Sequence, residues 1–467
     1  MPHIHFIAIG GKVMHALAIA LHQQGYHITG SDDALYGPTA QRLAQHQLLP
    51  PQAGWFPDKI TPQLDAVILG MHAKDDNPER QKAQVLGIPI YSFPEYLLSQ
   101  CQNKERVVIA GSHGKTTITA MIMHVLQTLG QDFDYMVGGE VPGFDLPLRL
   151  TPDAPVMILE GDEYPASRLD TRPKFLHYQH HIALISGIAW DHLNVYPTFE
   201  RYRDAFAALI AQTPKAGAVF WNKTDPHLKT LVKDKLKDRK DVFECAFETA
   251  KGKIEAGGYT SLKVGKKNIP LRVFGKHNLE NISAAQVVCE RLGVKPDDFY
   301  AAIASFKGVG WRLQVLDRKD DQSWLVFRDY AHAPSKWRAA TDAVKEQYPK
   351  HHLTAILELH TYSSLDSRFF AQFRHTLATA DAVVIFCDAQ NLVIKGRPLP
   401  TQEALKEAFF HPDLQLFTDA GALHNWCRGL RLRPRQVLLW MSSGNFGGFD
   451  LEGFFKTKRD SGSRSEG

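Results

Sequence analysis

Cysteine is scarce in this sequence, and its positions form no recognisable framework. The five cysteines are scattered along 467 residues, and no two of them stand in a Cys-x-x-Cys pair. An odd, scattered set argues against a disulfide scaffold and against a structural zinc site. We therefore expect free thiols in a protein of the reducing cytoplasm.

Long hydrophobic runs are also missing. No stretch approaches the roughly 18 consecutive apolar residues that a membrane helix needs. Residues 3–9 have the pattern of a strand and lack the apolar core and the cleavage site of a signal peptide. We therefore predict a cytoplasmic protein that does not bind a membrane.

Neither positive nor negative charge dominates the sequence. The chain has 54 Lys and Arg residues against 50 Asp and Glu residues, a formal net charge of +4. Proteins that bind nucleic acids usually concentrate basic residues in one stripe. The densest basic segment, residues 229–240, is interrupted by Asp234 and Asp238. We therefore predict no nucleic-acid partner.

What the sequence does contain is an alternation of strand and helix patterns in three blocks, which is typical of α/β domains built on parallel sheets. A chain of this length accommodates about three domains. We predict an α/β fold with a Rossmann-like N-terminal domain at 1–104, a central domain at 105–313 and a Rossmann-like C-terminal domain at 314–455. Residues 456–467 are charged and rich in Ser and Gly, and we expect them to be disordered.

The central block contains a candidate phosphate-binding loop between a buried-strand pattern and an amphipathic helix. It consists of Gly111, Ser112, His113, Gly114, Lys115, Thr116 and Thr117. Backbone N–H groups and the helix N-terminus would bind phosphate, Lys115 would neutralise its charge, and Thr116 would ligate Mg²⁺. The common G-x-x-x-x-G-K-[ST] form would place its first glycine at 109, where this chain has Ile109. We predict a P-loop ATPase domain that binds ATP and Mg²⁺; the alternative is a helix-entry turn with a surface lysine.

Two further positions in this block suggest metal ligands. Glu160 ends one apolar strand pattern, and Asp191-His192 follows another. An acid at the carboxyl edge of a sheet, near a phosphate loop, is well placed to hold Mg²⁺. A single histidine is more often an ordinary polar residue, but its position after another strand of this sheet favours a metal role. We predict Thr116, Glu160 and His192 as metal ligands. We predict Lys115, Glu160 and His192 as catalytic residues, because cations offset the repulsion when a carboxylate attacks a phosphate.

Six segments, in order along the chain, resemble the Mur ligase family. They are AGSHGKTT (110–117), LEGDEY (159–164), DH (191–192), GKHNLENISAA (275–285), GVGWR (308–312) and DYAHAP (329–334). The resemblance implies that ATP phosphorylates the carboxylate of a UDP-muramoyl substrate and that the amine of an amino acid or peptide then attacks the acyl phosphate. It also implies three domains, which bind the UDP end, ATP and the amine in that order.

The resemblance extends the predicted nucleotide site beyond the phosphate loop. It adds His277, Asn278, Asn281, Arg312 and Asp329. Asn278 would lie by the adenine or ribose, and Asp329 would accept ribose hydroxyls. The alternative is that HNLEN starts a helix, with Asn278 as N-cap and Asn281 exposed, and that Arg312 forms a surface salt bridge.

The first block carries a partial dinucleotide fingerprint, since Gly10-Gly11 is followed by Ser31-Asp32 without the full G-x-G-x-x-G. Two other classes of protein are alternatives for the chain. An NAD-dependent oxidoreductase would leave the Gly-Lys-Thr-Thr loop unexplained. A non-catalytic nucleotide-gated binding module would need no metal pair. In the muramate-binding branch of the resembled family the glycine loop faces UDP. We therefore assign to UDP-N-acetylmuramate the residues Gly10, Gly11, Ser31, Asp32, His72 and His113.

Two branches of the family act on UDP-N-acetylmuramate, one adding L-alanine and the other, the murein peptide ligases, adding the recycled tripeptide L-Ala-γ-D-Glu-meso-diaminopimelate. TRPKFLHY (171–178), MSSGNFGGF (441–449) and GSDDALYGP (30–38) resemble the tripeptide branch. Two other segments differ from the tripeptide branch. Where this chain has LELHTYSSLDSRF (357–369), the murein peptide ligases have an arginine-rich segment, and where it has DYAHAP (329–334), they have a His-His pair. Phe206 stands where several family members carry a carbamylated lysine, which this branch lacks.

The resemblance to the tripeptide branch implies a role in peptidoglycan recycling, with L-alanine addition in cell-wall biosynthesis as the alternative. Residues of the third domain would then bind the amine substrate. The candidates are His332, His360, Tyr362, Asp366, Arg368 and Asn445.

Overall fold

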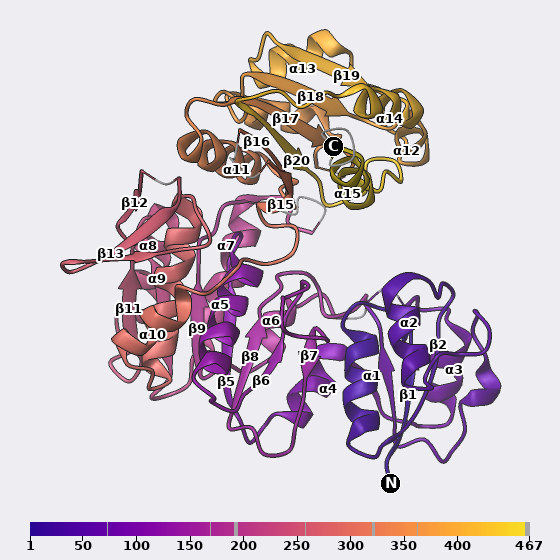
Figure 1. Cartoon of the computed structure of the whole chain (residues 1–467). Coiled ribbons are helices and arrows are strands. Elements are labelled where there is room, and N and C mark those ends of the chain that lie inside the picture. The colour runs from indigo at the N-terminus through magenta and orange to yellow at the C-terminus, as the bar shows by residue number, and fades with distance from the viewer. Residues whose placement is uncertain are drawn as a thin grey trace. The chain divides into compact units, whose positions relative to one another are not determined.

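The computed structural model describes residues 1–71, 73–168, 170–190, 195–256, 258–319, 323–361 and 363–462. It confirms the predicted α/β class, with helices covering several largely parallel sheets (Figure 1). The chain divides into two compact units. The first comprises Met1–Trp190, Val195–Glu248 and Asn281–Ile303, and the second contains Thr249–Glu280 and the chain from Ala304 onward.

The first unit begins with a four-stranded parallel sheet in the order β2-β1-β3-β4. Its strands are β1 (His3–Ile7), β2 (His27–Ser31), β3 (Ala66–Leu69) and β4 (Ile90–Ser92). Its helices are α1 (Met14–Gln23), α2 (Gly37–Gln45), α3 (Pro78–Val85) and α4 (Phe93–Gln100). Because β1 and β2 are parallel neighbours, the loops that follow them meet at one edge of the sheet.

The second sheet of this unit has seven strands in the order β11-β10-β9-β5-β8-β6-β7, and all of its strand pairs except β6–β7 are parallel. The strands are β5 (Glu105–Ala110), β6 (Asp134–Met136), β7 (Leu148–Arg149), β8 (Val156–Glu160), β9 (Ile182–Ile185), β10 (Ala218–Asn222) and β11 (Phe243–Phe247). The helices are α5 (Lys115–Thr128), α6 (Lys174–His177), α7 (Phe199–Ala211), α8 (Pro226–Leu236) and α10 (Pro296–Ile303). Since β5 lies between β8 and β9, the loops after these three strands share the carboxyl edge.

The connection between these two sheets is packed tightly. The Arg106 guanidinium donates hydrogen bonds to five backbone carbonyls, those of Cys101, Gln102, Lys104, Tyr178 and Gln179. The ammonium of Lys104 is also buried, where it donates to the carbonyls of Thr151 and Ala154 and pairs with Asp134 at 3.1 Å. Within the polar segment 102–105, Lys104 is therefore part of the packed interior, whereas residues 102, 103 and 105 are exposed.

The second unit contains a small antiparallel sheet of β12 (Gly252–Ile254), β13 (Thr260–Val264) and β14 (Lys267–Pro270). Its main sheet has six strands in the order β15-β16-β20-β17-β18-β19, and only β15 is antiparallel. These strands are β15 (Gln314–Arg318), β16 (Trp324–Asp329), β17 (His352–Glu358), β18 (Ala382–Phe386), β19 (Leu414–Phe417) and β20 (Gln436–Met441).

The helices of the second unit cover both faces of this main sheet. They are α11 (Pro334–Gln347), η2 (Ser367–Phe373), α12 (Ala389–Ile394), α13 (Gln402–Phe409), α14 (Ala420–Gly429) and α15 (Leu451–Gly462), while α9 (Lys276–Arg291) belongs partly to each unit. The expectation of a disordered segment from residue 456 differs from the structure, because α15 continues to Gly462. Phe455 in this helix is fully buried in an aromatic cluster with Trp440, and this packing holds the helix on the sheet.

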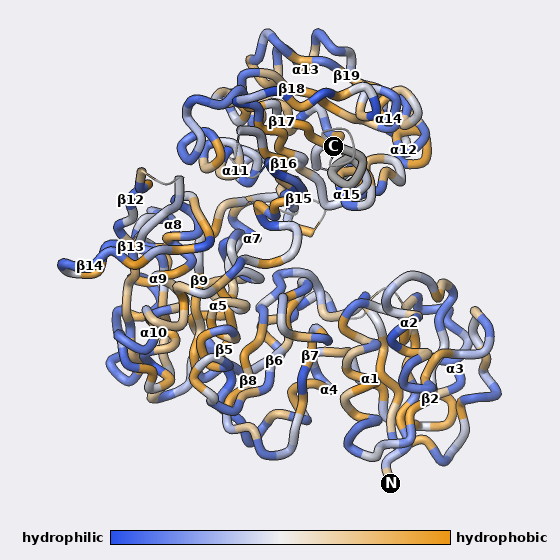
Figure 2. Tube along the Cα trace, viewed as in Figure 1, coloured by the Kyte–Doolittle hydropathy of each residue, from blue (hydrophilic) through white to orange (hydrophobic). Residues whose placement is uncertain are grey.

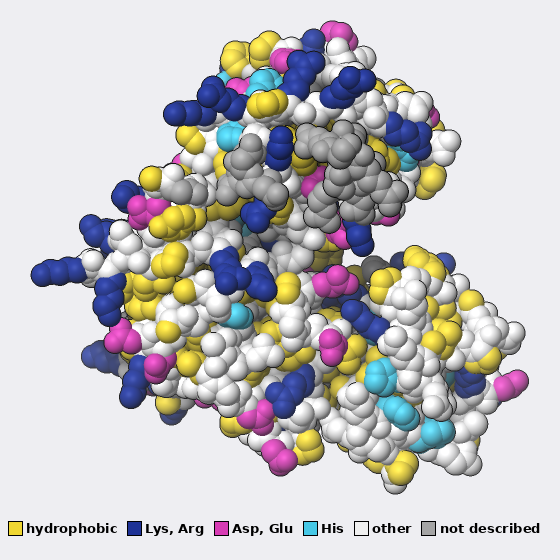
Figure 3. All heavy atoms as spheres, in the orientation of Figure 1, with side chains coloured by type: hydrophobic (Ala, Val, Ile, Leu, Met, Phe, Trp, Pro, Cys, Tyr) yellow, Lys and Arg dark blue, Asp and Glu magenta, His cyan; other side chains and the backbone are white. Residues whose placement is uncertain are grey.

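The hydrophobic residues follow the strands and the helix faces that cover them, as Figure 2 shows. Charged side chains of both signs are scattered over the face drawn in Figure 3, which agrees with the balanced composition. Among the described residues, no helix is both long and apolar enough to cross a lipid bilayer.

Candidate functional site

The predicted phosphate loop lies between the end of β5 and the start of α5. Gly111 and Gly114 have φ values of +123° and +77°, a region that favours glycine. A Cβ on Gly111 would lie 2.8 Å from the backbone nitrogen of Ser186, and a Cβ on Gly114 would overlap the side-chain oxygen of Asn281. Both glycines are therefore required by conformation and by close neighbours.

Lys115 is folded back onto this loop. Its ammonium donates to the carbonyl of Gly111 at 2.7 Å and to the carboxylate of Glu163 at 2.8 Å. Burial alone would lower the pKa of Lys115, but attraction by Glu163, Asp162 and Glu160 outweighs it, so the pKa lies above its ordinary value. The lysine is therefore a fixed cation beside the loop, as phosphate binding requires.

Thr116 and Glu160 form the predicted pair at the carboxyl edge. The Thr116 hydroxyl donates to Glu160 Oε1 at 2.8 Å, and the N–H of Gly138 donates to Glu160 Oε2 at 2.6 Å. A hydroxyl and a carboxylate at hydrogen-bonding distance, next to a phosphate loop, are oxygen donors of the type that Mg²⁺ prefers. These residues fit the predicted magnesium site, and a Cβ on Gly138 would lie 2.9 Å from Glu160 Oε1.

The loop that follows β9 supports the phosphate loop from the other side. The Ser112 N–H donates to the carbonyl of Gly187 at 2.9 Å, and the Ser112 hydroxyl accepts from the N–H of Ala189 at 3.0 Å. The Ser186 hydroxyl donates to the carbonyl of His113. His192, a predicted metal ligand a few residues farther on, lies outside the described residues.

The HNLEN segment forms the first turns of helix α9, as the alternative interpretation has it, but Asn278 is not the N-cap. Helix α9 already begins at Lys276, and Asn278 donates from its side chain to the carbonyl of Phe274 at 2.8 Å. Asn281 is buried against Gly114, in contrast to the exposed position of the alternative interpretation. Burial lowers the pKa of His277 to about 4, so its imidazole is neutral.

Arg312, Asp329 and His332 lie near one another in the second unit. The buried Asp329 carboxylate accepts from the N–H groups of Leu313 and Ala331, each at 2.8 Å. Burial raises the pKa of Asp329 above its ordinary value. The Arg312 guanidinium lies over the Tyr330 ring, 4.5 Å from its centroid. No carboxylate among the described residues forms an ion pair with it, in contrast to the surface salt bridge of the alternative interpretation. His332 Nδ1 lies 2.7 Å from the carbonyl of Tyr330.

The glycine loop of the first sheet is organised by Asp32. Its carboxylate accepts from the N–H of Gly10 at 2.7 Å and from that of Ala34 at 3.2 Å, and burial raises its pKa. Ser31 is buried and accepts a hydrogen bond from Lys59 at 3.2 Å. Lys59 is a cation that the sequence did not single out. Gly11 lies in the same loop, and His72 lies outside the described residues.

The amine-site candidates are divided between two clusters at the carboxyl edge of the six-stranded sheet. In the first, the buried Glu358 carboxylate accepts from the Ser442 hydroxyl and from the N–H of Phe446. A Cβ on Gly444 would lie 2.7 Å from this carboxylate, so the glycine-rich loop after β20 is fitted around it. His360 lies 3.0 Å from the Ser443 hydroxyl, and burial lowers its pKa.

The second cluster is built on Asp366. The Asp366 carboxylate accepts two hydrogen bonds from Arg368, at 2.9 and 2.6 Å, and pairs with Arg397 at 3.3 Å. The Arg368 guanidinium lowers the pKa of Asp366 to about 2. Lys395, two residues before Arg397, donates to the carbonyl of His360 in the first cluster. Asn445 is exposed and accepts from the N–H of Gly448, so its side chain serves the turn. Tyr362 lies outside the described residues.

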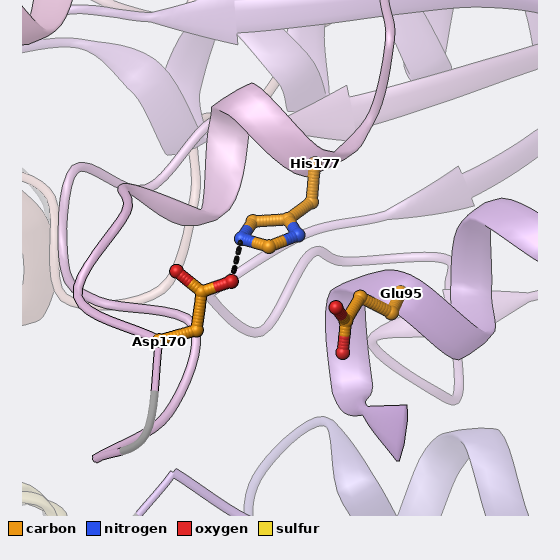
Figure 4. Close-up of side chains that lie close together, drawn as sticks. All are labelled: Glu95, Asp170 and His177. Carbon is orange, nitrogen blue, oxygen red and sulfur yellow. Dashed lines mark ion pairs between the residues drawn. The ribbon is translucent and has the colours of Figure 1, made fainter. Parts of the chain in front are cut away.

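A different group of potential metal ligands lies between α4 and α6 (Figure 4). The buried His177 ring faces the Asp170 carboxylate at 3.4 Å, with Glu95 nearby. Asp170 is already held by Arg172, and Glu95 caps α4 through the backbone and hydroxyl of Ser92. These partners indicate a structural role for the three side chains, which hold the TRPKFLHY segment (171–178) against α4.

Comparison with known proteins agrees on one family. Residues 109–289 match the model of the Mur ligase middle domain, and residues 3–104 match the Mur ligase family catalytic domain. The UDP-N-acetylmuramate–L-alanine ligase of Lactiplantibacillus plantarum is 31% identical over 390 residues, which cover 82% of this chain and 83% of that protein. The UDP-N-acetylmuramate–L-alanyl-γ-D-glutamyl-meso-2,6-diaminoheptandioate ligase of Haemophilus influenzae is 26% identical over 456 residues, covering 96% and 97%.

A solved structure has the same fold over the whole chain. The UDP-N-acetylmuramate–alanine ligase MurC of Thermotoga maritima superposes with a TM-score of 0.73 at 22% identity and covers 99% of this chain and 100% of that one. The fold is therefore that of the three-domain Mur ligases.

Proposed function

Because the chain belongs to the Mur ligase family, we propose that it uses ATP to join the tripeptide L-Ala-γ-D-Glu-meso-diaminopimelate to the carboxylate of UDP-N-acetylmuramate. ATP-driven amide-bond formation is the activity of the family, and the choice of amine is the proposal. Free cysteines throughout the described chain agree with a cytoplasmic site for this reaction.

In the proposed reaction the muramate carboxylate attacks the γ-phosphate of ATP, and the amine then attacks the acyl phosphate and expels phosphate. Lys115 and the loop N–H groups bind and orient the phosphates, which raises the rate by holding the reacting groups in place. Thr116 and Glu160 would hold Mg²⁺, which offsets repulsion between the two anions. His192 stays a predicted ligand.

One observation carries the choice of the tripeptide, namely the gathering of cations at the carboxyl edge of the six-stranded sheet. Lys395 contacts His360, and Arg368 and Arg397 share Asp366, so these clusters hold three cations against the two carboxylates of Glu358 and Asp366, an excess of one positive charge. The tripeptide has three carboxylates, whereas L-alanine has one. Guanidinium groups bind carboxylates with two parallel hydrogen bonds, so this edge suits the more anionic amine.

L-Alanine is the second candidate, because relatives that add it match most of this chain. The test is phosphate release from ATP with UDP-N-acetylmuramate, comparing the tripeptide with L-alanine. We expect a higher kcat/KM with the tripeptide, and a preference for L-alanine would refute the proposal. Silence with both amines would refute both candidates.

A variant pair tests the cationic edge directly. Arg397→Ala removes a cation that shares Asp366, and we expect it to raise the KM for the tripeptide roughly tenfold or more, the effect of losing a hydrogen bond between charged groups. Arg374→Ala is the control, because Arg374 lies over the Phe410 ring, outside both clusters. Equal KM values for the two variants would contradict the assignment.

A further inference from the structure

A cavity of about 700 Å³ opens in the second unit, at the amino-terminal edge of the six-stranded sheet. His352 and Gln436 begin β17 and β20 and are paired in register at this edge. The candidate amine site lies at the other end of the same strands. A seven-residue strand is about 20 Å long, so the two sites are separate. A cavity of this size falls within the range of about 300–1,000 Å³ that is typical of small-molecule sites.

Three arginines line this cavity. Arg431, Arg433 and Arg435 alternate along the segment between α14 and β20, and all three are exposed. No carboxylate in the described part of the chain forms an ion pair with any of these guanidinium groups. His352 adds a further nitrogen donor or acceptor to the same wall. Unpaired guanidinium groups around a concavity favour an anionic ligand with several oxygens.

Part of the wall is apolar and aromatic. This part is formed by Trp426, Leu430 and Pro434, and Gly429 and Gln436 complete the lining. The Trp426 ring packs against Phe417 and Trp440, with centroids 5.8 and 6.4 Å away, so the hydrophobic core fixes its position. The ring is only partly buried by these neighbours and also lines the cavity. A fixed indole at the border of a cavity offers a stacking surface for a planar ring.

We propose that this cavity is a second nucleotide site, which binds a nucleoside di- or triphosphate through the three arginines and stacks its base on Trp426. A base alone would leave the arginines unpaired, and inorganic phosphate would leave the indole unused. A concave wall of limited size suits a small ligand better than a flat membrane surface. The site is independent of the proposed ligase reaction, since it shares no residue with the predicted ATP, muramate or amine sites.

Equilibrium dialysis with radiolabelled ADP and, separately, UDP tests this proposal on the full chain. The test variant is R431A/R433A/R435A, and the control is Arg428→Ala, because Arg428 lies on the same helix end but pairs with Asn425 outside the cavity lining. We expect wild type and the control to bind one more equivalent of nucleotide per chain than the triple variant. The comparison of ADP with UDP shows which base is preferred.

A second pair of variants tests the aromatic wall. Trp426→Phe keeps a stacking ring, whereas Trp426→Leu removes it and keeps an apolar side chain. We expect affinity at the cavity to be retained in the first and reduced about tenfold in the second. Circular dichroism and the melting temperature of each variant show whether it is folded.

Three results would overturn the proposal. The first is equal stoichiometry and affinity in the triple variant and wild type. The second is competition by pyrophosphate as strong as that by ADP and UDP, with Trp426→Leu unchanged, which would make this a site for phosphate alone. The third is loss of binding to phosphatidylglycerol vesicles in the triple variant with nucleotide binding unchanged, which would make the cavity wall a membrane contact.

Discussion

Replacing Glu163 with glutamine tests the role of the buried carboxylate that holds Lys115. The side chain of Glu163 is 0% exposed and that of Lys115 is 14% exposed, so the pair is shielded from water. Removing one charge of a buried pair costs about 3–5 kcal/mol, because the remaining charge loses its compensation. Glutamine keeps a hydrogen-bond acceptor, so we expect a value near the lower end, about 3 kcal/mol, in the free protein.

The nucleotide-bound protein should respond differently. In the proposed site the Lys115 ammonium would exchange Glu163 for the phosphate oxygens, so wild type would give up the ion pair on binding. Glu163→Gln has no such pair to lose. We therefore expect the variant to be less stable than wild type without nucleotide and to gain more stability than wild type from ATP.

Thermal unfolding with and without Mg²⁺ and ATP measures both effects. A loss of about 3 kcal/mol corresponds to a decrease in melting temperature of roughly 6 °C or more for a unit of this size. Asp162→Asn is the control, because it makes the same charge change one residue away, where the carboxylate pairs with the partly exposed Lys174 and attracts Lys115 without forming an ion pair with it. We expect the control to lose at most about 1 kcal/mol. The reasoning would be refuted if Glu163→Gln were as stable as wild type without nucleotide, or if ATP stabilised the variant and wild type equally.

Three further predictions follow from the first unit. Gly114→Ala should abolish ATP binding measured by calorimetry, because its Cβ would overlap Asn281, whereas Gly130→Ala has a similar φ and no atom within 4 Å and should keep binding. Glu160→Ala should reduce turnover at least a hundredfold, and excess Mg²⁺ should not restore the wild-type rate. Burial lowers the pKa of His180 to about 4, so only the unfolded chain gains a proton as pH falls below about 6.5, and stability is lost down to about pH 4. His180→Gln should remove about 2 kcal/mol of the loss between pH 7 and pH 5, measured by urea unfolding, and an unchanged pH dependence would contradict this assignment.

The part of the site that could be predicted from sequence is the part built on parallel strands. Thr116 and Glu160 are 44 residues apart, yet they meet because β5 and β8 are neighbours and both end at the same edge. The strand pattern, the glycines and the residue after each strand are all visible in the sequence. The α/β class and the phosphate loop follow from the same signals.

Other contacts could not be predicted, because they depend on side-chain directions and long-range packing. The sequence GDE offers Asp162 and Glu163 as equivalent acids, and only the fold turns Glu163 toward Lys115 and Asp162 toward Lys174. Similarly, Lys59 contacts Ser31, 28 positions earlier in the chain, because the first domain's fold brings the segment after β2 and residues 57–59 together.

In the C-terminal segment, amino-acid composition and side-chain packing point to different structures. Its charged residues and its Ser and Gly content suggest disorder, but Phe454 and Phe455 precede them on the same helix and pack against each other. Phe455 also contacts Trp440 of β20. Composition averages over a segment, whereas a helix is held by the few side chains that meet the sheet.

The guanidinium of Arg106 limits how this chain can be divided. A protein assembled from interchangeable modules can be cut between them, and each piece then folds or recombines with a new neighbour. Here the five carbonyls that Arg106 binds come from the segment between the two sheets and from residues 178–179. A chain separated near residue 104 would therefore lose contacts on both sides of the cut. Exchange of the first sheet between homologous enzymes, in the laboratory or in evolution, therefore requires a donor segment whose backbone presents its carbonyls to Arg106 in the same way.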